Sequence, residues 1–253
     1  MSGKKMNNNR LGEAGNVLFL ILIAVALFAA LSYAVTQSTR TGGGSGDNET
    51  ALISSAQLTQ YPASIRTAVV RMIIGGTDVG DLEFNTPTNF SNCETGTNNQ
   101  FCVFHPNGGG ATYASAPTDM MSAGSGNTAG TWTFNAENQI DLAGTSSGDD
   151  DPVAATADVI AFLPGITLSL CQRINQELGL PSTPPVETGI NVATQMVNSD
   201  GSSSAGICSV CAAGATIGTG GAGAGALDGQ PFGCFELTAA SGNYVYYHVL
   251  VER

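Results

Sequence analysis

The sequence predicts an α+β protein: an N-terminal transmembrane or filament helix, then an antiparallel-sheet headgroup with one or two packed helices, disulfide-stapled and loop-rich. Three observations predict this class: an uncharged apolar run near the N-terminus, helical spacing of apolar residues at 157–178, and two strand-like segments at the C-terminal end. Only 11% of residues are charged, and 33 of 253 are glycine. This composition favours a loop-rich domain over a helical bundle.

The apolar run at 17–35 carries no charged residue across its 19 positions. As a helix it would extend about 28 Å, close to the roughly 30 Å hydrocarbon core of a bilayer. Lys4, Lys5 and Arg10 precede it. The positive-inside rule therefore places residues 1–15 in the cytoplasm and 36–253 outside.

Two other interpretations of this run remain open. Small residues at Ser32 and Ala34 would suit a cleavable secretory signal, although the usual apolar region of such a signal is about 7–15 residues. A buried core helix is disfavoured, because the run is apolar on every face and follows basic residues.

The residues from Arg10 to Leu20 combine a short basic leader, a glycine and the start of the apolar helix. This arrangement resembles the class III signal of type IV pilins and pseudopilins. The resemblance implies cleavage by a prepilin-type peptidase after Gly15 and before Asn16, with the Gly12–Glu13 bond as the alternative. It also implies that segment 16–40 contacts membrane lipid first, and then self-associates or packs on related pilin-like subunits in a filament.

One position departs from that family. Its members usually carry glutamate at the fifth position after cleavage, where this chain has Leu20, or Val17 for the alternative cut. The resemblance therefore does not distinguish a major from a minor subunit.

Beyond the anchor we expect a glycine hinge at 41–47, an amphipathic helix at 48–76, and an extracytoplasmic α+β domain at 77–253. Pro62 should kink or divide the first helix, and Gly75 and Gly76 should end it. Within the domain, helical spacing predicts a helix at 157–178, and residues 199–226 form a low-complexity loop. Strands are predicted at 81–84, 101–104, 131–134, 139–142, 232–238 and 244–251, the last two as a hairpin.

Six cysteines, an even number, all lie beyond residue 92, on the side expected to face an oxidising compartment. We expect structural disulfides, with Cys93–Cys102 as the first pair because only a polar loop separates them. The others would link helix and hairpin to the glycine-rich region, with the pairing left open: Cys171, Cys208, Cys211 and Cys234. A redox dithiol or half a zinc site at Cys208–Cys211 is disfavoured, since neither a surrounding βαβ pattern nor a second such motif exists.

The charge and the motifs exclude several function classes. From residue 72 onward there are 17 acidic and 2 basic residues, so we expect no nucleic-acid partner. The acidic run at 149–151 could bind calcium, but its spacing matches no calcium loop, and solvated acids before a helix are the simpler interpretation. His105 and His248 stand in no catalytic motif. His105 precedes Pro106 and is expected in a turn, and His248, in a predicted strand among tyrosines, is expected to be packed or exposed. We therefore expect no enzyme, no metal and no cofactor.

The favoured function is a structural, pilin-like subunit of a bacterial surface filament or pseudopilus. It would be anchored in the inner membrane before assembly and later lie at the cell surface. The alternative is a secreted or membrane-tethered, disulfide-rich adhesion or binding domain.

Overall fold

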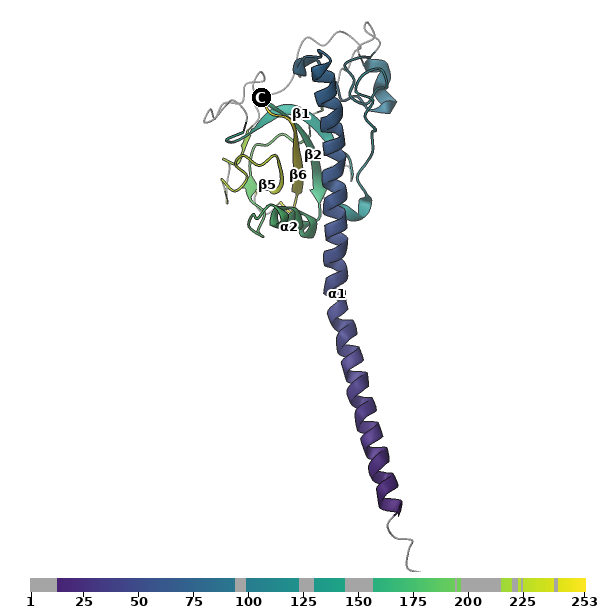
Figure 1. Ribbon diagram of the computed structural model, residues 1–253. Coiled ribbons are helices and arrows are strands. Elements are labelled where there is room, and N and C mark those ends of the chain that lie inside the picture. The colour runs from purple at the N-terminus through teal and green to yellow at the C-terminus, as the bar shows by residue number, and fades with distance from the viewer. Residues whose placement is uncertain are drawn as a thin grey trace, which may run out of the picture. The chain divides into compact units, whose positions relative to one another are not determined.

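The computed structural model describes residues 13–93, 99–122, 130–143, 157–193, 195–196, 215–219, 223, 225–238 and 241–253. The chain divides into two compact units, Met1–Thr50 and Ala51–Arg253, and each is described by itself. Figure 1 gives the labels of the elements.

The helix α1 spans Glu13–Ile74 without a break. The predicted hinge at 41–47 is therefore wrong, because these residues are helical. Each glycine costs about 1 kcal/mol in a helix, but propagation from helix on both sides needs no new nucleus. Pro62 also lies inside α1 and does not divide it. Burial of Leu58 and Ile65 on the same helix offsets the cost of the proline.

The glycines after α1 end it as predicted. The amide of Gly76, which has a φ of 100°, donates to the carbonyl of Ile73, and the amide of Thr77 donates to Met72. A left-handed residue of this kind closes the last helical turn and favours glycine.

In the described part of the chain, no helix is both long and apolar enough to cross a bilayer. The transmembrane helix of the predicted fold class is thus not found in the described part of the chain.

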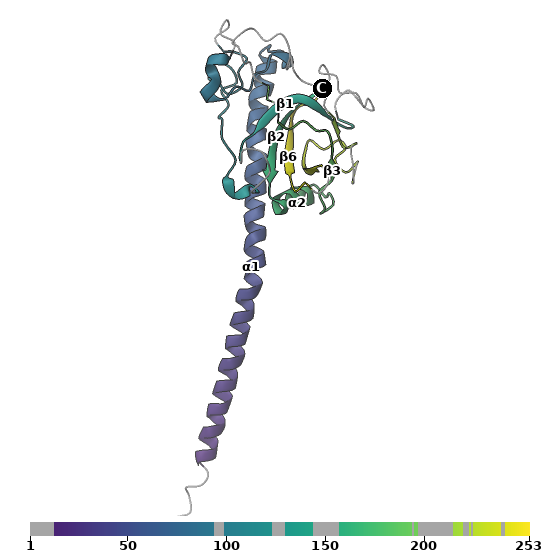
Figure 2. The ribbon, with the colours of Figure 1, turned by 180° about the vertical axis from the view of Figure 1, so that it is seen from behind.

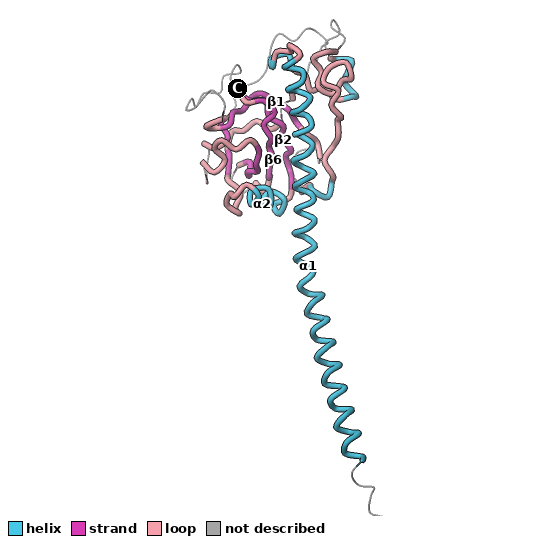
Figure 3. The backbone as a smooth tube through the Cα atoms, in the orientation of Figure 1, coloured by secondary structure: helices cyan, strands magenta, loops and turns pink. Residues whose placement is uncertain are grey.

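Within the described residues, six strands form one sheet in the order β3-β5-β6-β2-β1-β4. The pairs β1·β2, β2·β6 and β5·β6 are antiparallel, whereas β3·β5 and β1·β4 are parallel. Figure 3 shows the strands in magenta among long loops. The strands are β1 (Thr133–Ile140), β2 (Asp158–Ile166), β3 (Val186–Glu187), β4 (Thr216–Ile217), β5 (Phe232–Leu237) and β6 (Tyr244–Val251).

The sheet is therefore mixed, and the predicted antiparallel headgroup is wrong. The strands β3 and β4, each parallel to its one neighbour, have two residues each and form the two edges. So short a strand shows no alternation in the sequence. The edges also approach each other, because the amide of Gly218 beside β4 donates to Oε1 of Glu187 in β3 at 3.0 Å. The sheet is thus nearly closed.

The segment 157–178, predicted as one helix, is a strand in its first half and a helix in its second. Residues Asp158–Ile166 form β2, and only Leu168–Glu177 form the helix α2. Every residue of β2 is buried, with Leu163 facing one apolar cluster and Phe162 the other. A strand buried on both faces is apolar throughout and cannot be told from a buried helix by periodicity.

The remaining strand predictions have mixed outcomes. The C-terminal hairpin is confirmed, with Cys234 opposite Tyr246. Segments 131–134 and 139–142 each contribute two residues to one strand, β1, which begins in the first and ends in the second. Segments 81–84 and 101–104 form no strand and meet only at a parallel bridge between Glu83 and Cys102. Short 3₁₀ helices lie at η1 (Val79–Asp81), η2 (Pro87–Asn92) and η4 (Thr118–Met120).

Two apolar clusters fill the second unit. The larger joins α1 residues such as Val69 to Trp132, Phe134 and Tyr246 of the sheet region. The smaller includes Phe162, Tyr247 and Leu227 on the other face of β2 and β6. Figure 2, the view from behind, shows the last turns of α1 beside β1, β2 and β6. The predicted packing of a helix on a sheet thus involves the 51–74 part of α1.

Candidate functional site

The first candidate site is an apolar surface on the first unit. Every residue from Val17 to Tyr33 is exposed. The large apolar side chains among them are 41% to 73% exposed. Soluble monomers rarely expose so continuous an apolar surface, which usually marks a contact with protein or lipid. We call residues 17–33 the apolar segment.

The predicted cleavage residues lie at the start of α1. Glu13 is its first residue, and Gly15 and Asn16 follow within it. Gly12 lies outside the described residues, as do the acidic run at 149–151 and both Cys208 and Cys211. Nothing in the structure tests cleavage at either glycine.

Among the described residues of the second unit there are two disulfides. Cys93–Cys102 is confirmed, with Cα atoms 6.2 Å apart. The second joins Cys171 of α2 to Cys234 of β5, with Cα atoms 5.4 Å apart. The expectation that helix and hairpin would each link to the glycine-rich region is therefore wrong, because they link to each other.

Asn175 reinforces the second disulfide. It lies one turn after Cys171 on α2, and its side chain pairs with the backbone of Cys234. Nδ2 donates to the Cys234 carbonyl at 2.9 Å, and Oδ1 accepts from the Cys234 amide at 3.0 Å. One covalent bond and two buried hydrogen bonds thus hold α2 on β5. Figure 1 shows α2 at one end of the sheet.

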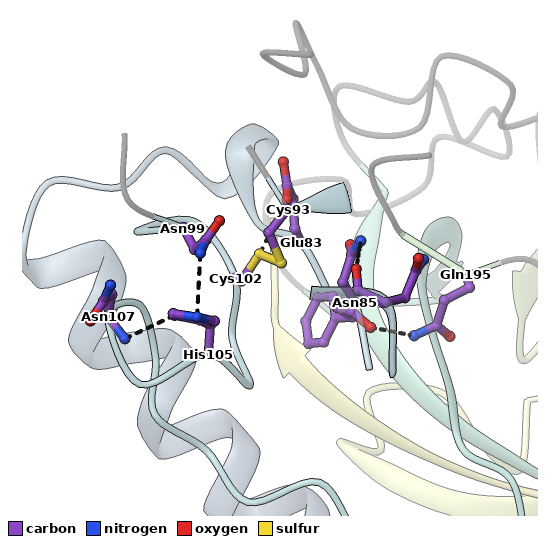
Figure 4. Close-up of a disulfide and its surroundings, with 10 residues drawn as sticks. Glu83, Asn85, Cys93, Asn99, Cys102, His105, Asn107 and Gln195 are labelled. Carbon is purple, nitrogen blue, oxygen red and sulfur yellow. Dashed lines mark hydrogen bonds between the residues drawn. A yellow bond between two sulfur atoms is a disulfide. The ribbon is translucent and has the colours of Figure 1, made fainter. Parts of the chain in front are cut away.

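The Cys93–Cys102 bridge carries a buried acid. Oε2 of Glu83 lies 3.3 Å from Sγ of Cys102. Glu83 is 2% exposed, and both cysteines are fully buried. Figure 4 shows the Glu83 side chain beside the sulfur–sulfur bond. These three residues are the one group of potential metal ligands among the described residues. Its sulfurs are bonded to each other, so they do not offer the thiolates that a soft metal requires.

His105 belongs to the turn after this bridge. Its Nδ1 accepts from the Asn107 amide at 3.1 Å, and its Nε2 lies 3.3 Å from Nδ2 of Asn99 (Figure 4). The ring packs edge-on against Phe90. The predicted turn role is consistent with these contacts, none of which involves a nucleophile.

On the other side of the bridge, Gln195 connects two segments. Its Nε2 donates to the carbonyl of Phe84 at 3.0 Å, and its Oε1 accepts from the amide of Phe134 in β1 at 2.8 Å. Asn85 donates to the carbonyl of Asn89 at 3.3 Å. Figure 4 shows the side chains of Asn85 and Gln195 near the disulfide. Gln195 therefore ties the disulfide-bearing loop, at Phe84, to strand β1.

Asp158 is a buried carboxylate at the start of β2. Its oxygens accept from the amides of Ile140 and Arg253, both at 2.9 Å. Burial raises its pKa to about 6, and these two amides lower it less than burial raises it. Asp158 thus joins the end of β1 to the C-terminal residue.

His248 is a buried histidine in β6. Nδ1 lies 3.0 Å from the hydroxyl of Tyr246, and the ring stacks on Phe232. Burial, with a smaller contribution from Arg66, lowers its pKa to about 4. Burial also raises the pKa of Tyr246 and Tyr247. The neutral imidazole therefore acts in packing, which is one of the two roles expected from its position in a predicted strand.

No family model, curated protein or solved structure matches this chain.

Sequence reasoning missed Glu83, Asp158 and Asn175. Asp158 and Asn175 lie within the segment misassigned as one helix. Glu83 is an acid between apolar neighbours, Leu82 and Phe84, and that pattern alone could have indicated a buried carboxylate.

Proposed function

We propose that the chain is a pilin-like structural subunit that assembles through its N-terminal helix into an extracytoplasmic filament or pseudopilus. The observation that carries the proposal is the apolar segment: seventeen consecutive exposed residues, without a charge, within the single helix α1.

The physical argument is the cost of leaving this surface in water. Burying one large apolar side chain is worth about 1.5–3 kcal/mol. The segment carries twelve such side chains. Identical helices from other copies offer the matching uncharged surface. Packing against them removes the apolar side chains from water without leaving a charge unpaired.

The basic residues of the leader support retention in a membrane before assembly. Lys4, Lys5 and Arg10 favour the cytoplasmic side of an inner membrane, so the subunit would be held there until the leader is removed. A prepilin-type peptidase would cut after Gly15, or after Gly12. The disulfides of the second unit suit an oxidising compartment beyond that membrane.

The test is a charge placed in the apolar segment. Leu22→Lys with Leu27→Lys should reduce the chain recovered in the sheared surface fraction at least about tenfold, because each buried unpaired ammonium costs several kcal/mol. Ile74→Lys is the matched control. Ile74 is also an apolar residue of α1 and is 82% exposed, but it lies outside the segment.

Ile74→Lys should leave the surface fraction unchanged. Normal recovery of the Leu22 and Leu27 double variant, with its two disulfides formed, would contradict assembly through the apolar segment.

A further inference from the structure

The position of Glu83 beside Cys102 is fixed by the backbone. The Glu83 amide donates to the Phe101 carbonyl at 3.0 Å, and the Val103 amide donates to the Glu83 carbonyl at 2.8 Å. These two bonds flank Cys102 and hold its segment parallel to residue 83. The carboxyl group is therefore placed against the sulfur by the backbone pairing and does not depend on the disulfide.

We propose that the Glu83 carboxylate shields the Cys93–Cys102 disulfide from thiol exchange. In that reaction a thiolate attacks one sulfur and forms a mixed disulfide, and the other cysteine leaves as a thiolate. With a dithiol reductant, its second thiol then attacks the mixed disulfide. The second cysteine is released, and the reductant, having lost two electrons, becomes a cyclic disulfide.

Both directions of attack meet the charge of Glu83. Both sulfurs are fully buried, so a thiolate reaches them only through a local opening of the loop; attack on Cys102 then brings it to the sulfur that lies 3.3 Å from Oε2. Attack on Cys93 leaves the new negative charge on Cys102, at the same place. A like charge at this distance raises the pKa of the leaving thiol and slows its departure. Neither route avoids the carboxylate.

The second disulfide provides an internal comparison. Within the described part of the chain, no cluster of potential metal ligands includes Cys171 or Cys234. Both cysteines are nevertheless as fully buried as Cys93 and Cys102. The two bridges are thus alike in exposure, and among the described residues only Cys93–Cys102 belongs to such a group with an acid.

The test is the rate of reduction of each bridge by dithiothreitol at neutral pH in the folded, full-length chain. Alkylation at timed intervals and mass spectrometry of the peptides follow each cysteine pair. Glu83→Gln should speed reduction of Cys93–Cys102 roughly tenfold. The rate at Cys171–Cys234 should not change.

Glu83→Asp is the second variant, because it keeps the carboxyl group on a side chain one methylene shorter. Its Cys93–Cys102 rate should stay within about threefold of the unaltered chain. An unchanged rate in Glu83→Gln, equal acceleration of both bridges, or equal acceleration by Gln and Asp would overturn the proposal. The last two results would show that reduction follows loosening of the fold.

Discussion

At the scale of single residues, Asp158 and His248 make opposite contributions to stability as pH changes. The folded-state pKa of Asp158 is about 6, above its ordinary value of 3.8. The folded protein therefore binds this proton more tightly than the unfolded chain, and the stability that Asp158 contributes below pH 4 is lost as pH rises through 6. The pKa of His248 is about 4, below 6.5, so its contribution is present above pH 6.5 and is lost as pH falls through 4.

We expect the two groups to be separable by substitution. Asp158→Asn should become more stable relative to the unaltered chain as pH rises from 4 to 7, by about 2 kcal/mol. His248→Gln should become more stable relative to the unaltered chain as pH falls from 7 to 4, by about 3 kcal/mol. Urea unfolding at four pH values measures both slopes. Variant curves that run parallel to that of the unaltered chain would show that neither group titrates as its burial requires.

At the scale of elements, the tie between α2 and β5 should matter most for stability. The Cys171–Cys234 bond closes a sequence separation of 63 residues, whereas Cys93–Cys102 closes 9. The longer loop restricts the unfolded chain more strongly when it is closed. Asn175 adds two hydrogen bonds at the same place.

Replacing Cys171 and Cys234 together by alanine should therefore lower the free energy of unfolding by about 4 kcal/mol. The matched pair, Cys93→Ala with Cys102→Ala, should lower it by about 3 kcal/mol. Both pairs are fully buried, so the cavities that they leave are comparable. Denaturant titration gives both values, and the reverse order would contradict the loop-closure explanation.

Some elements could be predicted because their signal is local. The hairpin of β5 and β6 alternates about a turn at Ser241 and Gly242, and its register agrees with that pattern. The Cys93–Cys102 pair follows from a short loop between two segments that adjoin. Gly76 ends α1 because few other residues adopt its φ of 100°.

Other features depend on tertiary contacts that no local pattern contains. Strand β2 resembled a helix because both of its faces are buried. The edge strands β3 and β4 are too short to show alternation. Cys171 meets Cys234 only because α2 packs on β5, and Glu83 meets Cys102 only through backbone pairing.

At the scale of the whole molecule, the two units differ in surface chemistry. The first exposes an uncharged apolar segment at 17–33. The second has buried apolar clusters on both faces of its sheet and contains most of the acidic residues behind the net charge of −12. This division suits a subunit that assembles through one part and presents the other to solvent.

Assembly through α1 requires that the mature chain keep the apolar segment. Mass spectrometry of the chain purified from cells gives its first residue directly. We expect a mature chain that begins at Asn16, or at Glu13 for the alternative cut. A chain that begins at Val35 would have lost the whole segment, and the proposed filament function would be wrong.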